Sequence, residues 1–176
     1  NNNNIKNYYN YNIDITSSVE VFDLLENLKT KNILPNIFIF NAGINKIDLD
    51  KNFNLENFEE MIRINFYSTT IFCNFIHKEN ITNITILFIS SFSTIYQTNN
   101  YSFGYGFSKL LINNYVKNLQ KNFSSNTYKL LLLGPVNTGI KRYFYKESSY
   151  KKILFSIVSK SSEVTSIKIY NFSLNK

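Results

Sequence analysis

Three continuous apolar runs divide the chain, at Ile37–Phe40, Ile84–Ile89 and Leu130–Leu133. Runs without polar alternation are expected of strands in a parallel sheet, because both of their faces are buried. A further short strand is predicted over Tyr8–Ile15, at the start of the chain. The pattern therefore predicts four strands, all of them short.

Segments of helical periodicity lie between these runs. Ser17-Ser18-Val19-Glu20 has the spacing of a capping box and predicts a helix that reaches about Lys31. A longer helix is predicted from about Leu55 to His77, with apolar residues three or four positions apart. The same pattern predicts helices over Tyr105–Phe123, Phe144–Val158 and Glu163–Phe172.

Strands that alternate with helices predict an α/β fold in which helices cover a parallel sheet. Right-handed crossovers place the carboxyl ends of all the strands at one edge, where open α/β sheets bind ligands. Polar residues stand at or just past these ends: Asp14, Asn41, Ser91 and Thr138. With 176 residues and no visible linker, the chain is expected to form a single domain.

Composition narrows the function classes. Asn, Lys, Ile, Tyr and Phe are abundant, as in proteins from A/T-rich genomes, so the net charge of +7 carries little information. Lysine is scattered, which does not favour nucleic acid as a partner. Cys73, the one cysteine, is expected to be buried, and His77, the one histidine, is expected at the surface near the end of a helix. Metal-ligand spacing is absent. No apolar run approaches the ~20 residues of a membrane span, and no signal peptide is visible, so a cytoplasmic protein is expected.

The most informative local spacing is Tyr105-Gly-Phe-Ser-Lys109. Residues four apart share a helix face, and an ammonium near a phenol favours the phenolate. Such a pair can carry general acid–base chemistry near neutral pH. In a chain so rich in tyrosine and lysine, about one such pair is expected by chance, and an exposed helix pair is the alternative.

The order of the neighbouring segments raises the specificity of this pair. Asn41-Ala42-Gly43, Asn65 and Ser90-Ser91 precede it, and Gly134-Pro135-Val136-Asn137-Thr138 follows. This series resembles the short-chain dehydrogenase/reductase family, over about Asp14 to Thr138. The resemblance implies a Rossmann-like, doubly wound parallel sheet, with residues 1–176 forming one partial domain.

One departure concerns the family's Gly-rich phosphate loop, Thr-Gly-x-x-x-Gly-x-Gly, which the sequence does not contain. In the family's strand order, Tyr8–Ile15 then corresponds to strand 3. We therefore expect a sheet that lacks the first two strands and also the last. We also expect the 176 residues to be a piece of a longer reading frame or a degraded gene, with Ile37–Phe40 as an open edge strand.

The resemblance implies a role for each catalytic candidate. Tyr105 is the proton donor in ketone reduction, and Lys109 lowers its pKa and binds the nicotinamide ribose. Ser91 hydrogen-bonds the substrate oxygen, and Asn65 holds a water that links the lysine to solvent. Ser91 could instead be a helix or turn cap, and Asn65 could reflect the abundance of Asn. Ser91 lies one position farther from Tyr105 than is common in the family, which leaves Ser93 as a fallback.

The resemblance also implies a binding site for NAD or NADP, without deciding between them. Asp14 corresponds to the acid that receives the adenine amino group, although it could simply form the turn before the next helix. Tyr105 and Lys109 would also contact the cofactor. The remaining candidates for cofactor binding are Ile15, Asn41, Ala42, Gly43, Pro135, Val136 and Thr138.

Two functions remain open on this sequence. The first is an NAD(P)-dependent oxidoreductase that interconverts a small-molecule carbonyl and an alcohol, with a substrate lid over Lys141–Lys152. The second is a non-catalytic fragment or relic that acts as an interaction subunit. In either case the family implies a homo-oligomer built on the helices that contain Asn65 and Tyr105.

Overall fold

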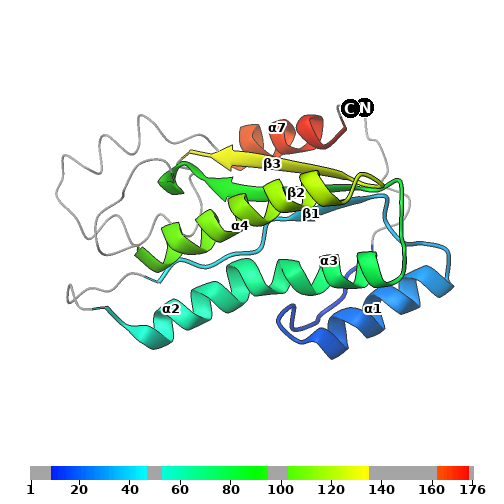
Figure 1. The fold of residues 1–176 in the computed structure, drawn as a ribbon, viewed down its shortest axis with the longest axis horizontal. Helices are drawn as coiled ribbons and strands as arrows, with labels where there is room; N and C mark the ends of the chain where they lie inside the picture. Colours follow the sequence, from blue (N-terminus) through cyan, green and yellow to red (C-terminus); the bar gives the residue numbers. More distant parts are fainter. Residues whose placement is uncertain (1–8, 47–52, 95–102, 135–161, 175–176) are drawn as a thin grey trace.

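A computed structural model of the chain describes residues 9–46, 53–94, 103–134 and 162–174. Its sheet contains three parallel strands, β1 (Ile37–Phe40), β2 (Thr85–Ser91) and β3 (Thr127–Leu133), in the spatial order β1-β2-β3. Ile37 lies opposite Thr85, and Thr85 lies opposite Thr127. The carboxyl ends of the three strands thus meet at one edge (Figure 1).

The connections between the strands are helical, as the apolar pattern predicted. α1 (Ser18–Thr30) precedes β1, and α4 (Phe103–Asn122) joins β2 to β3. Between β1 and β2 the helix is continuous in direction but has three parts, α2 (Leu55–Ile62), η1 (Arg63–Tyr67) and α3 (Ser68–Lys78). The middle part, η1, is a π-helical turn.

Side chains at the helix starts explain where these helices begin. The Ser17 hydroxyl accepts a hydrogen bond from the Glu20 amide at the start of α1, as the capping-box spacing predicted. Asn54 caps α2 in the same way, because its side-chain oxygen accepts from the Asn57 amide. Each cap satisfies an amide that the helix itself leaves unpaired.

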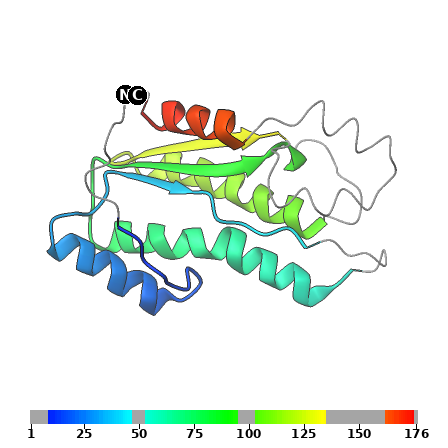
Figure 2. The same cartoon turned by 180° about the vertical axis from the view of Figure 1, so that it is seen from behind.

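Helices cover both faces of the sheet. The core lies between one face and helices α1, α3 and α4, and it includes Phe38, Ile86 and Phe88 from the strands. α7 (Ser162–Leu174) packs on the other face (Figure 2), where Lys129 Nζ of β3 donates to the carbonyl oxygens of Phe172 and Ser173. Helices on both faces confirm the doubly wound α/β class.

The edge formed by β1 also fits the expectation from the sequence. Among the described strands β1 pairs only with β2, so its other edge is open. Phe38 and Phe40 point to the helical core, whereas the side chain of Ile39 remains 43% exposed on the opposite face. An apolar residue at an open strand edge favours pairing with a further strand.

The structure corrects the prediction of a strand over Tyr8–Ile15. In its described part, residues 9–15, the chain forms no strand and instead leads into the turn before α1. A lone extended segment has no partner for its backbone groups, so an apolar pattern there is not sufficient to form a strand. β3 also begins three residues earlier than predicted, at Thr127. The helix predicted over Phe144–Val158 lies outside the described residues.

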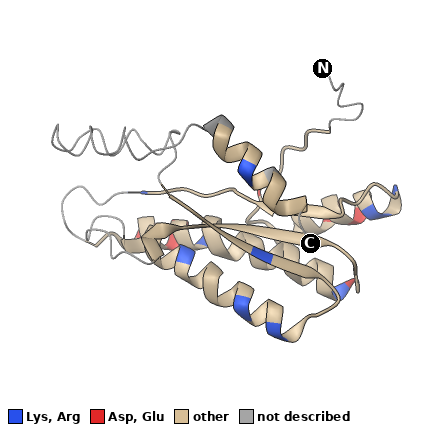
Figure 3. Ribbon diagram, turned by 90° about the horizontal axis from the view of Figure 1, so that it is seen from above, with Lys and Arg blue, Asp and Glu red and all other residues tan. Residues whose placement is uncertain are grey.

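Lysine and arginine are spread over several elements of the described chain (Figure 3), as the sequence indicated. None of the helices in the described ranges is long and apolar enough to cross a membrane.

Candidate active site

Tyr105 and Ser91 meet beside the carboxyl end of β2. Ser91 is the last residue of β2, and Tyr105 lies in the first turn of α4, which begins at that edge of the sheet. The Ser91 side chain is close enough to the phenol to oppose part of the rise in the pKa of Tyr105 that burial causes. Ser91 Oγ also accepts a hydrogen bond of 3.2 Å from the Ser93 amide. Tyr105, the predicted proton donor, and Ser91, predicted to hydrogen-bond the substrate oxygen, are therefore neighbours.

The other two serines of this segment make different contacts. Ser90 is buried, and its hydroxyl donates to Oδ1 of Asn113, a residue of α4, at 2.6 Å. Ser93, the fallback candidate, contributes its backbone amide to Ser91. Of the three serines, Ser91 is the one whose side chain affects the pKa of Tyr105.

Lys109 lies one helical turn after Tyr105 and is only 4% exposed. Its ammonium donates to the Ile89 carbonyl oxygen at 2.9 Å and lies 5.8 Å from the centre of the Tyr105 ring. Burial lowers the pKa of Lys109 to about 8, because the charged form loses its hydration. An ammonium with such a pKa can exchange protons near neutral pH.

The electrostatics of Tyr105 differ from the expectation that Lys109 lowers its pKa. Burial raises the pKa of Tyr105, and the neighbouring Ser91 side chain opposes that rise in part. In this arrangement the Lys109 ammonium is directed to the Ile89 carbonyl oxygen rather than to the phenol oxygen. Tyr105 is thus held as a neutral phenol, the form that can donate a proton.

Asn65 is fully buried in the π-helical turn η1. Its side-chain oxygen accepts from the Ile44 amide at 2.7 Å, and its side-chain nitrogen donates to the Ile44 carbonyl oxygen at 2.9 Å. The same nitrogen donates to Ser108 Oγ at 2.9 Å. Asn65 therefore ties the segment after β1 to the helix that carries Tyr105 and Lys109.

Gly43 marks the closest approach of that segment to the buried polar groups. A β-carbon at this position would lie 3.2 Å from Asn65 Oδ1 and 3.5 Å from Lys109 Nζ. The first distance is shorter than most real contacts of a β-carbon, so a side chain here would displace the Asn65 amide. Glycine thus permits the segment Asn41-Ala42-Gly43 to pass directly over Asn65 and Lys109.

Ser108 is the residue of this group that the sequence analysis did not select. It is fully buried, and its hydroxyl donates to the Tyr105 carbonyl oxygen at 2.7 Å while it accepts from Asn65. Its spacing of three residues from Tyr105 places it near the same helix face, which is the signal that could have identified it.

The candidates for the adenine end of the cofactor are in the segment before α1. Asp14 and Ile15 belong to the turn before α1, where Asp14 Oδ1 accepts from the Thr16 amide and hydroxyl, both at 2.8 Å. The Thr16 hydrogen bonds lower the pKa of Asp14. These contacts match the alternative in which Asp14 forms the turn before the helix. Pro135, Val136, Thr138 and the predicted lid lie outside the described residues.

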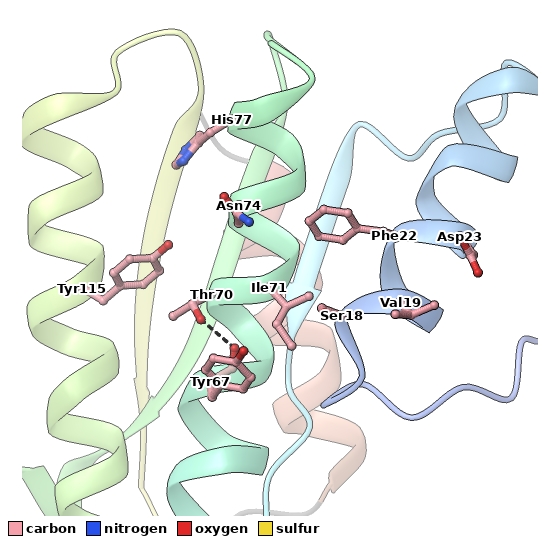
Figure 4. Close-up of a pocket in the computed structure, with 10 residues that line it drawn as sticks. All are labelled: Ser18, Val19, Phe22, Asp23, Tyr67, Thr70, Ile71, Asn74, His77 and Tyr115. Atoms are coloured by element: carbon pink, nitrogen blue, oxygen red, sulfur yellow. Dashed lines mark hydrogen bonds between the residues drawn. The ribbon is translucent and has the colours of Figure 1, made fainter.

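A groove of about 780 Å³ lies on the outer helical layer, between α1, α3 and α4 (Figure 4). Its lining includes Phe22, Tyr67, Asn74, His77 and Tyr115. None of the predicted catalytic residues lines this groove. It is therefore a surface separate from the group around Tyr105 and Lys109.

The one histidine and the one cysteine of the sequence have structural contacts in this arrangement. His77, expected at the surface, is half-buried: its ring stacks on Phe123 with centroids 3.9 Å apart, and Nε2 lies 2.8 Å from the Tyr128 hydroxyl. Burial lowers the pKa of His77. Cys73 is buried, as predicted, and burial raises the pKa of its thiol to about 12.

Comparison with solved structures supports the fold. The chain superposes on a variant of ElxO solved with NADPH bound, with a TM-score of 0.79 and 21% identity. The match covers 94% of this chain and 70% of the ElxO chain. For a short chain dehydrogenase/reductase of Saccharomyces cerevisiae the TM-score is 0.73 at 17% identity, over 84% of this chain and 62% of that one.

A third similar structure is gluconate 5-dehydrogenase from Burkholderia cenocepacia J2315, solved with NADP and tartrate. The TM-score is 0.69 at 15% identity, and the match covers 78% of this chain but only 55% of that one. The chain thus spans little more than half the length of this relative. No curated protein matches the sequence.

The family profile described as short chain dehydrogenase matches residues 1–148, which is most of the sequence. This match agrees with the resemblance in the order of the motifs and with the doubly wound sheet. The chain therefore belongs to the short chain dehydrogenase family.

Proposed function

We propose that this chain forms the catalytic part of an NAD(P)-dependent oxidoreductase that interconverts a carbonyl and an alcohol. The observation that carries the proposal is the grouping of Ser91, Tyr105, Lys109 and Asn65 around the carboxyl ends of β1 and β2. Ligands of open α/β sheets bind at this edge. The family membership of the chain supports the same class of reaction.

Each side chain has a role that follows from its contacts. The Tyr105 phenol is neutral and can donate its proton to a substrate oxygen, and the Ser91 hydroxyl beside it can hydrogen-bond the same oxygen. Lys109, with its pKa lowered to about 8, is the nearby group that can exchange a proton near neutral pH. Asn65 holds Gly43 and Ile44 close to the Lys109 ammonium.

A nicotinamide cofactor would supply the hydride for this chemistry. One observation fits its ribose end: the described residues take only one of the three Lys109 N–H donors. The pyrophosphate end has no such support, because the 176 residues contain no Gly-rich phosphate loop. Similar structures have been solved with NADP, NADPH or NAD bound, which supports either cofactor.

The 176-residue chain alone is expected to bind NADH and NADPH very weakly, because the Gly-rich loop normally supplies the amides that hold the pyrophosphate. Titration of the purified chain, followed by cofactor fluorescence, measures this. The matched sample is a longer form in which upstream sequence adds a Gly-rich loop and a strand beside β1. That form is expected to bind cofactor and to consume it with a panel of ketones and aldehydes. Micromolar binding by the 176 residues alone would contradict this prediction.

A non-catalytic interaction subunit is the second candidate function. The absence of the phosphate loop from the sequence and the open edge of β1 favour it. The same titration separates the two functions. If a longer form with the Gly-rich loop binds neither NADH nor NADPH, the interaction subunit becomes the better explanation.

In either function we expect a homo-oligomer that packs through the groove between α1, α3 and α4. Asn74 is exposed on α3 at the floor of this groove, beside the half-buried His77 (Figure 4). Asn74→Arg should therefore lower the assembly state, as measured by light scattering after size exclusion. Asn27→Arg, an exposed change on α1 that does not line the groove, is the matched control and should leave it unchanged. Equal assembly in all three proteins would exclude the groove as the contact.

A further inference from the structure

Ser108 occupies a fully buried position between two parts of the site. Its hydroxyl has one donor, which it gives to the Tyr105 carbonyl oxygen at 2.7 Å. Its oxygen accepts the second N–H of the Asn65 side chain at 2.9 Å. A serine within a helix commonly bonds only to the preceding turn. Here the same hydroxyl also reaches a residue 43 positions away in the sequence.

Both N–H donors of the Asn65 side chain make hydrogen bonds. One N–H goes to the Ile44 carbonyl oxygen and the other to Ser108, while the side-chain oxygen accepts from the Ile44 amide. A continuous chain of hydrogen bonds thus runs from the Tyr105 backbone through Ser108 and Asn65 to the segment after β1. All of its side chains are fully buried, so water does not compete for these bonds.

We infer that Ser108 is a positioning residue, which fixes the helical turn bearing Tyr105 and Lys109 against Asn65 and the Gly43–Ile44 segment. It touches no reacting atom and acts through Asn65. Its effect on turnover rests on the proposed oxidoreductase function, whereas its effect on the Asn65 amide does not.

The spectroscopic test needs no substrate. In the full-length protein labelled with ¹⁵N-asparagine, both side-chain protons of Asn65 should be shifted downfield and exchange slowly with solvent. In Ser108→Ala one of the two should move upfield and exchange faster, because it loses its acceptor. Ser108→Thr retains a hydroxyl that can make the same helix bond and should restore the signal. If both Asn65 protons are the same in Ser108→Ala as in the wild type, the inference is overturned.

The kinetic test is a double-mutant cycle with Asn65→Ala. Ser108→Ala should lower kcat about tenfold in the wild type, because a buried donor loses its partner. In the Asn65→Ala background the same change should have an effect of less than about twofold, since the two residues act as one unit. Equal losses in both backgrounds would show that Ser108 does not act through Asn65.

Ser68→Ala is the matched control for both tests. Ser68 is also a buried helix serine, and its hydroxyl donates to the Ile64 carbonyl oxygen at 2.6 Å, away from Ser108. It should leave kcat and the Asn65 signals unchanged. If the longer form with the Gly-rich loop reduces no carbonyl at all, the proposed function fails, while the asparagine signals still decide the role of Ser108.

Discussion

Tyr105→Phe is expected to lower turnover by about 10²- to 10⁴-fold while cofactor binding persists, in a form of the protein that binds cofactor. The substitution retains the ring and its packing but removes the hydroxyl beside Ser91. The substrate oxygen then has no phenolic proton to receive. Steady-state rates of NAD(P)H oxidation and a cofactor titration of the same variant measure the two quantities.

Tyr115→Phe is the control for this experiment. Tyr115 lies in the same helix, but its side chain is close to Cys73, far along the helix from Tyr105. This variant should retain most of the turnover of the wild type. A Tyr105→Phe protein with near-normal turnover would remove Tyr105 from the mechanism.

The second large effect expected is on the pH dependence of stability, through Lys109. Burial lowers the pKa of Lys109 from 10.5 to about 8 in the folded chain. Between these values the unfolded chain binds the proton that the folded chain has lost, so stability rises with pH. From pH 8 to 9.5 the rise should be about 2 kcal/mol, at about 1.4 kcal/mol per pH unit. Below pH 8 the cost of the buried ammonium is present in full.

Lys109→Met removes the titrating group and keeps an apolar chain of similar length. Denaturant unfolding of the wild type and of this variant at several values between pH 7 and 9.5 measures the difference. The gain in stability of the wild type over this range should be absent from Lys109→Met. Leu110→Met, at an exposed position in the same helix, should retain the gain. Parallel curves for the wild type and Lys109→Met would mean that the ammonium is not buried in solution.

The fold could be predicted from the sequence where an element depends on its own residues. The run Ile84–Ile89 is apolar because both faces of this strand are covered, and the Ser17 cap places the start of α1 correctly. The run Ile37–Phe40 also forms a strand, although Ile39 is 43% exposed on one face. The prediction over Tyr8–Ile15 is wrong in its described part because a strand also requires a neighbour. No property of those residues alone shows whether a neighbouring strand is present.

The residues of the candidate site could be predicted from the sequence, but the direction of the Tyr105 pKa shift could not. Tyr105, Lys109 and Ser91 were selected by order and spacing, and the structure places them together; their catalytic roles remain a prediction. The direction of the Lys109 ammonium depends on the Ile89 carbonyl oxygen, which belongs to another element. Ser108 was missed for a similar reason, since its partner Asn65 is distant in sequence.

The π-helical turn η1 rotates the side chains of α3 about the helix axis relative to those of α2. One turn of Arg63–Tyr67 holds more residues than an α-helical turn, so the apolar stripe of α2 and that of α3 do not belong to a single helical wheel. Met61 of α2 packs beneath Gly104 of α4, while Ile71 and Phe75 of α3 enter the sheet core. Asn65 lies in η1, where α2 and α3 meet. The length of this turn, more than the identity of its other residues, therefore sets where the Asn65 side chain points.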